Sequence, residues 1–304
     1  MAEAVILMNN ISKVYKKNAV VKNFSLDVKK GSICGLIGPN GAGKTTIMKI
    51  LAGLIFQSEG GLSFYGSSDD LDSNRKRMSF MIEAPIVDHQ MTAYENLNYI
   101  RYVRGYPDEK RIDEVLDIVG LSNAGKKKAA KFSLGMRQRL GIAMALLTKP
   151  EILVLDEPVN GLDPEGIVEV RRILQRLSYE QNTTILISSH LLSELSEMCT
   201  DFSIISSGRL VENLSAEELD KRCRNHIVVR TNDIDRTAAV LEDKLSIRSY
   251  KAVHGGIIEI YEQLDNIEKI SKTITDSGLI ITKLNEEGKK LEDYYLEKVG
   301  GSNE

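Results

Sequence analysis

Short apolar runs, separated by longer stretches of helical periodicity, mark out the first two thirds of this chain. Residues 33–37, 78–82, 152–155 and 184–189 consist mostly of apolar and small side chains. Runs of this length without alternation are typical of strands that are buried on both faces of a parallel sheet. We therefore predict an α/β fold whose central sheet is mixed and covered by helices.

Two other patterns interrupt this arrangement. Residues 5–14 and 20–28 alternate apolar with polar positions on either side of Lys16-Lys17-Asn18, which predicts an antiparallel pair, and residues 60–66 add a short strand bounded by glycines. From residue 92 to Gly120 the apolar positions recur at helical spacing. We expect an antiparallel β subdomain and a helical subdomain at about residues 86–150.

The pattern changes after residue 215. Alternating segments at 226–230, 247–253, 257–261 and 279–284 predict strands, and residues 235–245, 267–277 and 291–299 predict helices. The sequence thus divides into a first domain of residues 1–215 and a small C-terminal α+β domain of residues 216–304. No pattern in the second domain suggests catalysis, so regulation, dimerisation and a spacer role all stay open.

Composition narrows the class of protein. With 304 residues, 42% hydrophobic and 27% charged, the chain is long enough for two ordinary globular domains. Its 40 Lys and Arg against 43 Asp and Glu give no support to nucleic-acid binding. The three cysteines are scattered, no histidine pair has ligand spacing, and no apolar run approaches the roughly 18 residues of a membrane span. We expect a cytoplasmic protein that does not cross a membrane by itself.

The strongest chemical motif follows the apolar run at residues 33–37. It reads Gly38-Pro39-Asn40-Gly41-Ala42-Gly43-Lys44-Thr45-Thr46 and matches the pattern G-x-x-x-x-G-K-[ST] of a phosphate-binding loop. Backbone N–H groups of such a loop surround a polyphosphate, Lys44 is expected to contact the β- and γ-phosphates, and Thr45 is expected to bind Mg²⁺. The sequence therefore predicts a nucleotide site with ATP and Mg²⁺ as cofactors.

Carboxylates end two of the predicted strands. Asp156 follows residues 152–155 and is placed to reach a Mg²⁺ ion held by Thr45, while Glu157 is placed to orient or deprotonate an attacking water. Glu83 ends the run at 78–82, at the sheet edge where α/β proteins bind ligands. We predict Glu157 as a catalytic residue and Glu83 and Asp156 as metal ligands.

Four further residues have both a structural and a functional interpretation. Tyr15 ends a strand and could stack on adenine, and His190 ends another and could donate to a γ-phosphate. Ser133, followed by Gly135, is a good helix N-cap and also marks a second place where an anion could approach a helix N-terminus. Taken alone, these residues leave the structural interpretation open.

Together the motifs resemble one family. The phosphate loop, Ser133-Leu134-Gly135-Met136, Leu155-Asp156-Glu157-Pro158, Gly161-Leu162-Asp163 and His190 occur in the order seen in the nucleotide-binding subunits of ATP-binding-cassette (ABC) transporters. This resemblance covers residues 1 to about 215. It implies a P-loop NTPase cassette in which His190, as the switch histidine, is a catalytic residue beside Glu157. It also implies that Tyr15, Ser133, Gly135 and Asp163 contribute to the nucleotide site, with Ser133 and Gly135 contacting ATP bound by a second subunit.

The resemblance also implies partners. Such a subunit works as a homodimer or heterodimer of ATP-binding chains and lies peripherally at the cytoplasmic face of the membrane, held there by a permease subunit. Two departures are informative: the family normally has glutamine where Glu83 stands, and Leu-Ser-Gly-Gly-Gln where this chain has residues 132–136. Both are similar to the exporters linked to bacitracin and lantibiotic resistance. A carboxylate at residue 83 could strengthen Mg²⁺ coordination or repel the γ-phosphate.

Three functions follow for comparison with the structure. The first is an ATPase subunit that powers export through separate membrane proteins, with an antimicrobial peptide as the cargo. The second is a non-transport ABC ATPase of translation or DNA repair, although such proteins usually carry two cassettes or a long coiled coil. The third is a nucleotide-binding regulator without turnover, which the presence of Glu157 disfavours.

Overall fold

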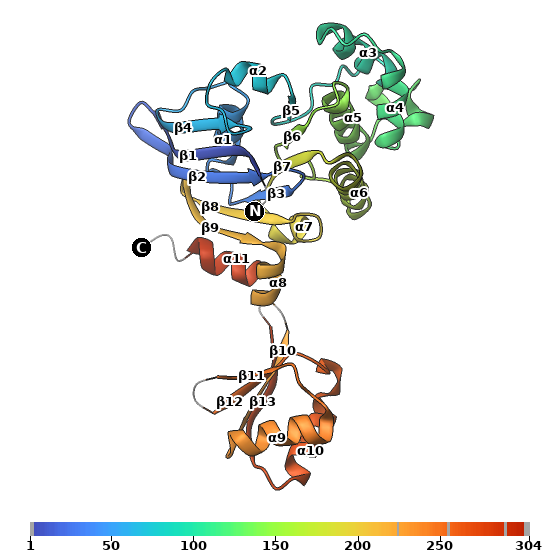
Figure 1. The fold of residues 1–304 in the computed structure, drawn as a ribbon. Helices are drawn as coiled ribbons and strands as arrows, with labels where there is room; N and C mark the ends of the chain where they lie inside the picture. The colour runs from blue at the N-terminus through green and yellow to red at the C-terminus, as the bar shows by residue number, and fades with distance from the viewer. Residues whose placement is uncertain (1–2, 224, 254–255, 289–290, 301–304) are drawn as a thin grey trace. The chain divides into compact units, whose positions relative to one another are not determined.

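Two compact units make up the chain. The computed structural model describes residues 3–223, 225–253, 256–288 and 291–300 (Figure 1). One unit comprises Met1–Ala216 and Tyr295–Glu304, and the other comprises Glu217–Tyr294. These units differ from the predicted limits of 1–215 and 216–304 at the last helix, because the residues from Tyr295 onward group with the first unit. The outermost predicted limits, residues 1 and 304, lie outside the described residues.

A six-stranded sheet forms the centre of the first unit, in the order β5-β6-β7-β3-β8-β9. Its strands β5 to β8 run parallel to one another, and β9 is antiparallel to β8. The strand bounds are β3 Ile33–Ile37, β5 Met78–Met81, β6 Ile152–Leu155, β7 Thr184–Ser189, β8 Asp201–Ser206 and β9 Arg209–Ser215. The predicted α/β fold with a mixed sheet is therefore confirmed.

The sheet order explains where a site can form. Parallel strands end at the same edge of a sheet, and β5, β6, β7 and β3 are consecutive neighbours. The loops that follow these strands carry Glu83, then Asp156 with Glu157, then His190, and finally the phosphate loop. Residues that lie up to 150 positions apart in the chain are thus brought to one edge.

Helices surround this sheet (Figure 1). α1 begins at Lys44 of the phosphate loop, and α5 begins directly after Ser133. The helices of this unit and their bounds are α1 Lys44–Leu51, α2 Leu71–Arg75, α3 Ala93–Val103, α4 Lys110–Ile118, α5 Leu134–Leu146, α6 Pro164–Gln181 and α7 Leu192–Ser196, with 3₁₀ turns η1 Ser122–Ala124 and η2 Ala129–Lys131. None of the helices in the described ranges is both long enough and apolar enough to span a membrane.

The predicted antiparallel pair is also present. A second sheet of the first unit has the order β2-β1-β4, with β1 at Ala4–Tyr15, β2 at Asn18–Lys29 and β4 at Glu59–Phe64. Its apolar face contributes Ile6, Phe24 and Phe64 to the cluster that contains Ile47 and Met48 of α1. Alternation in sequence therefore places one face of this sheet over the helix that follows the phosphate loop.

The second unit has the element order βαββαβ. Its strands are β10 His226–Thr231, β11 Tyr250–Val253, β12 Ile257–Ile260 and β13 Ile281–Glu287, paired antiparallel in the order β11-β12-β10-β13. Its helices are α9 Ile234–Leu245 and α10 Ile267–Asp276, with the 3₁₀ turn η3 Leu264–Asn266; α8 Ala216–Cys223 and α11 Leu291–Gly300 extend across its two limits. Ile227 and Ile260 from the strands pack with Leu241 and Ile274 from α9 and α10. The unit therefore has its own hydrophobic core.

A matched pair of glycines tests how tightly the β8–β9 turn packs on the backbone of β2. Gly208 and Gly66 have φ of 79° and 76°, but an added Cβ would lie 2.3 Å from the Val20 carbonyl oxygen at Gly208 and would meet nothing within 4 Å at Gly66. Gly66→Ala should lower the free energy of unfolding by about 1 kcal/mol, the cost of the left-handed conformation. Gly208→Ala should lower it by about 3 kcal/mol, because backbone must also move. Urea denaturation followed by circular dichroism measures both, and equal losses would contradict the packing argument.

Candidate functional site

The phosphate loop connects β3 to α1. Gly43 is the N-cap of α1 with φ of 107°, a conformation that glycine adopts without strain. Gly38 packs so closely that a Cβ would lie 2.3 Å from the Ile205 carbonyl oxygen. A cavity of about 230 Å³ opens over the loop, and residues 40–46 line it together with Val20, Glu157 and Asn160. The loop therefore presents a helix N-terminus and free backbone N–H groups to one small cavity, as phosphate binding requires.

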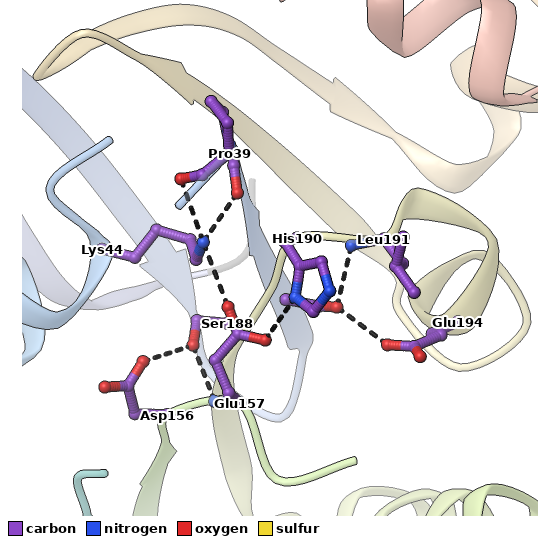
Figure 2. A network of polar contacts seen from close by, with 10 residues as sticks. Pro39, Lys44, Asp156, Glu157, Ser188, His190, Leu191 and Glu194 are labelled. Carbon is purple, nitrogen blue, oxygen red and sulfur yellow. Dashed lines mark hydrogen bonds and ion pairs between the residues drawn. The ribbon is translucent and has the colours of Figure 1, made fainter. Parts of the chain in front are cut away.

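Lys44 is buried at the base of this loop with its side chain 5% exposed. Its Nζ donates to the carbonyl oxygens of Gly38 at 2.6 Å and Pro39 at 3.3 Å, and it forms an ion pair with Glu157 Oε1 at 3.1 Å (Figure 2). An ammonium group has three protons, so these contacts use its full donor capacity. A phosphate group that binds Lys44 therefore has to replace one of these three partners.

Glu157 lies between two functional side chains. Besides Lys44, its carboxylate contacts His190, whose Nδ1 is 2.8 Å from Glu157 Oε2 (Figure 2). The backbone of Glu157 is in the left-handed region with φ of 49°, which is uncommon for a residue other than glycine and occurs often at functional positions. The structure thus brings together three of the predicted residues, with Glu157 as the link.

Ser188 is a functional residue that the sequence patterns did not reveal. It is fully buried on β7, donates from Oγ to Asp156 Oδ1 at 2.6 Å, and accepts from the backbone N–H of Glu157 at 2.9 Å (Figure 2). The neighbouring Ser189 instead contacts Glu194. Because β6 and β7 pair in parallel with Leu155 opposite Ile187, the serine two residues before His190 lies next to Asp156, and this register is the signal that could have identified it.

The residues around Asp156 fit a magnesium ion. Thr45, Glu83 and Asp156 line one cavity of about 490 Å³ together with Glu157. Mg²⁺ prefers oxygen ligands, usually takes only one or two carboxylates from the protein, and keeps several waters or phosphate oxygens. Within the described ranges no group of three or more Asp, Glu, His or Cys side chains forms a complete metal cage, which agrees with that sparse coordination.

Glu83 has a different partner from the one predicted. Its carboxylate accepts a hydrogen bond from Lys49 Nζ at 2.7 Å, and its side chain is 65% exposed. Its backbone is left-handed with φ of 65°. Sequence patterns gave no reason to single out Lys49, because a lysine on a helix is ordinarily a solvated charge. Metal ligation by Glu83 therefore stays a prediction, with Lys49 as a competitor for its oxygen.

The remaining predicted residues lie apart from the phosphate cavity. Ser133 is the N-cap of α5, accepting from Met136 N–H at 3.2 Å, and Asp163 is the N-cap of α6, accepting from Gly166 N–H at 3.0 Å. Neither residue lines the two cavities described above, and nor does Gly135. Both side chains thus cap a helix within one chain, and their contact with nucleotide stays a prediction.

Tyr15 ends β1 and points into solvent. Tyr15 is 44% exposed. Lys13 Nζ lies over its ring, 4.9 Å from the ring centroid, and forms a cation–π contact. An exposed ring can stack on a planar base, so the geometry permits the predicted role but does not require it.

Comparison with known proteins agrees with this geometry. The sequence profile of the family described as ABC transporter matches residues 21–160. The chain is 39% identical over 301 residues to the bacitracin transport ATP-binding protein BcrA of Bacillus licheniformis, covering 98% of each chain. It is 39% identical over 227 residues to the lantibiotic transport ATP-binding protein SrtF of Streptococcus pyogenes, covering 74% of this chain and 98% of that protein.

Solved structures give the same result. The structure described as the ATP-binding subunit of an ABC transporter superposes with a TM-score of 0.61 at 28% identity, covering 71% of this chain and 92% of that one. These relatives favour transport over a role in translation or repair. The structure joins a phosphate loop, paired acidic residues and a histidine in one network, and a transport relative matches nearly the whole chain. The chain belongs to the ATP-binding subunits of ABC transporters, which hydrolyse ATP to drive transport.

Proposed function

We propose that this ATPase powers export through separate permease subunits at the cytoplasmic face of the membrane, with bacitracin- or lantibiotic-type peptides as its cargo. The observation that carries the catalytic part is the position of Glu157 between Lys44 and His190. The cargo follows from similarity to a bacitracin transport protein over 98% of both chains. The glutamate at residue 83, in place of the usual glutamine, supports the same branch.

Each residue of the network has a chemical task in this proposal. Phosphate oxygens of ATP displace Glu157 from Lys44, so that the carboxylate becomes free to accept a proton from an attacking water. His190 remains as the partner that holds the carboxylate in place, and Ser188 fixes the backbone of Glu157. Thr45 and Asp156 would hold Mg²⁺, which neutralises charge that develops on the β- and γ-phosphates.

The active form in this proposal is a dimer, a homodimer or a heterodimer with a second ATP-binding chain. Ser133 and Gly135 do not line the phosphate cavity of their own chain. Leu134, which lies between them, is 46% exposed, so this segment is at the surface. The free N-terminus of α5 is therefore available to the nucleotide of a second chain. Asp163, at the start of α6, belongs to the same exposed surface in this proposal.

A groove beside Glu83 is the proposed permease site. This cavity of about 630 Å³ is lined mainly by apolar side chains of the loop after β5 and of α3 and α5, including Ile82, Pro85, Tyr99 and Met144. Ile86 on its wall is 91% exposed. Exposed apolar surface of this kind marks interaction sites. In this proposal the permease subunit of the transporter binds in the groove.

We assign the cassette to residues 1–215 and an accessory domain to residues 216–304. The separate hydrophobic core within Glu217–Tyr294 supports a boundary near residue 216, while Tyr295–Glu304 group with the first unit. The lantibiotic transport relative supports the same boundary, because 74% of this chain matches nearly all of that protein. A cassette without an accessory domain of this kind thus exists among transport ATPases.

Glu157→Gln tests the catalytic assignment. The variant should bind ATP but hydrolyse it about 10²- to 10⁴-fold more slowly, because an amide cannot accept the proton of the attacking water. Steady-state phosphate release and binding of a fluorescent ATP analogue measure the two properties. Glu268→Gln, the same change at an exposed residue in the first turn of α10, is the control and should hydrolyse normally. Turnover of Glu157→Gln within a few fold of the unmodified protein would remove Glu157 from the role of base.

Mixing two inactive variants tests the composite site. Lys44→Ala removes the phosphate contact and Ser133→Arg blocks the N-terminus of α5, so each variant alone should be inactive. A heterodimer of the two has one intact site, and an equal mixture should recover about a quarter of the normal rate if the sites act independently. A mixture of Lys44→Ala with the double variant Lys44→Ala/Ser133→Arg has no intact site and should stay inactive. Recovery of activity in both mixtures would refute independent composite sites. Recovery in neither mixture would also refute them, provided that sedimentation shows ATP-dependent dimers of Glu157→Gln.

The permease groove can be tested with one charge. Ile86→Glu should abolish capture of a polytopic membrane protein from detergent-solubilised membranes of the source organism, because a carboxylate is costly to bury in an apolar contact. Leu54→Glu, at a residue that is 66% exposed and does not line the groove, should leave capture unchanged. Equal capture by both variants would place the permease contact elsewhere.

A further inference from the structure

The ion pair between Lys49 and Glu83 links α1 to the loop after β5. Lys49 follows Thr45 by one helical turn, so both side chains lie on the same side of α1. Lys49 Nζ and Glu83 Oε1 are 2.7 Å apart. The left-handed backbone of Glu83, at φ of 65°, sets the direction of this side chain. Lys49 thus connects the predicted metal ligand Glu83 to α1, the helix that also carries Thr45.

Carboxylates outnumber cations around this pair. Glu83, Asp156 and Glu157 line one cavity together with Arg137, which also donates to the Phe132 carbonyl oxygen, and carboxylates that share a site repel one another. The hydrogen bond to Glu83 raises the pKa of Lys49, and the nearby charge of Asp156 contributes in the same direction. The charge of Lys49 is therefore stabilised by both carboxylates. Lys49 in turn offsets the negative charge of Glu83, a charge that a glutamine at this position would not carry.

The pair is weak enough to exchange partners. The side chains of Lys49 and Glu83 are 34% and 65% exposed, whereas those of Lys44 and Glu157 are 5% and 20% exposed. Exposed ion pairs contribute little net free energy, since water screens the charges. A divalent cation beside Thr45 and Asp156 attracts a carboxylate more strongly than one ammonium group does.

We propose that Lys49 is a positioning residue that holds the carboxylate of Glu83 when the site contains no Mg²⁺ and gives it up when Mg²⁺ and nucleotide bind. The proposal rests on the nucleotide site of the proposed function. Ala84 and Pro85 line both the cavity that Glu83 faces and the proposed permease groove. The exchange therefore takes place in the wall that separates the metal site from the membrane partner.

A double-mutant cycle tests the exchange without measuring turnover. The thermal unfolding midpoint is recorded with excess ADP, which is not hydrolysed, over a series of Mg²⁺ concentrations for the unmodified protein, Lys49→Met, Glu83→Gln and the double variant. Lys49→Met should lower the half-effective Mg²⁺ concentration about threefold, because Glu83 no longer has to leave a partner. Glu83→Gln should raise it about threefold. In the Glu83→Gln background, Lys49→Met should have little further effect.

Several outcomes overturn the proposal. An equal effect of Lys49→Met with and without Glu83 would show that Lys49 acts only as a general positive charge, and a rise in the Mg²⁺ requirement would show that Lys49 assists the metal. No rise with Glu83→Gln would show that Glu83 is never transferred to the metal. Lys76→Met, which removes an equal charge at the end of α2, is the control and should change nothing. If ADP and Mg²⁺ do not stabilise even the unmodified protein, the proposed nucleotide site itself fails.

Discussion

The parallel alignment of β5, β6, β7 and β3 is the constraint on which the rest of the first unit depends. Because neighbouring parallel strands end at one edge of the sheet, the four loops that follow them lie next to one another. Register then decides finer details, as it does for Ser188, which lies beside Asp156 and so can bond to it. A strand added between β6 and β3 would move the acidic residues after β6 away from the phosphate loop after β3.

Within this frame, charge pairing holds the resting site together. Lys44 and Glu157 are both largely buried, and each is costly to bury alone, so they stabilise one another until phosphate oxygens arrive. Ser188 satisfies Asp156 and the backbone of Glu157 from the interior. The site therefore consists of the contacts that Ser188 makes between β6 and β7 and of two ion pairs formed by α1, a buried one of Lys44 with Glu157 and a more exposed one of Lys49 with Glu83. In the proposed mechanism only the two ion pairs change when a ligand binds.

The second unit follows a simpler rule. Its four strands alternate in sequence, and both long helices place apolar residues on one face of the sheet, as Ile227 and Leu241 illustrate. This core is separate from the one beneath the phosphate loop. The two cores thus form from different parts of the chain, and the lantibiotic transport relative matches 74% of the chain.

The sequence by itself determined most of the strands, the phosphate loop and the order of the motifs, because short apolar runs, glycine spacing and a Lys-Thr pair have few alternative structures. It did not predict β8 and β9. It also placed Asp156, Glu157 and His190 at strand ends. It did not identify the partners of these side chains. Ser188 and Lys49 have ordinary local sequences, and only the pairing of β6 with β7 and the approach of α1 to Glu83 made them functional candidates. Tertiary structure decided these contacts, because a hydrogen bond between residues 30 or more positions apart depends on how strands and helices pack and leaves no periodic signal along the chain.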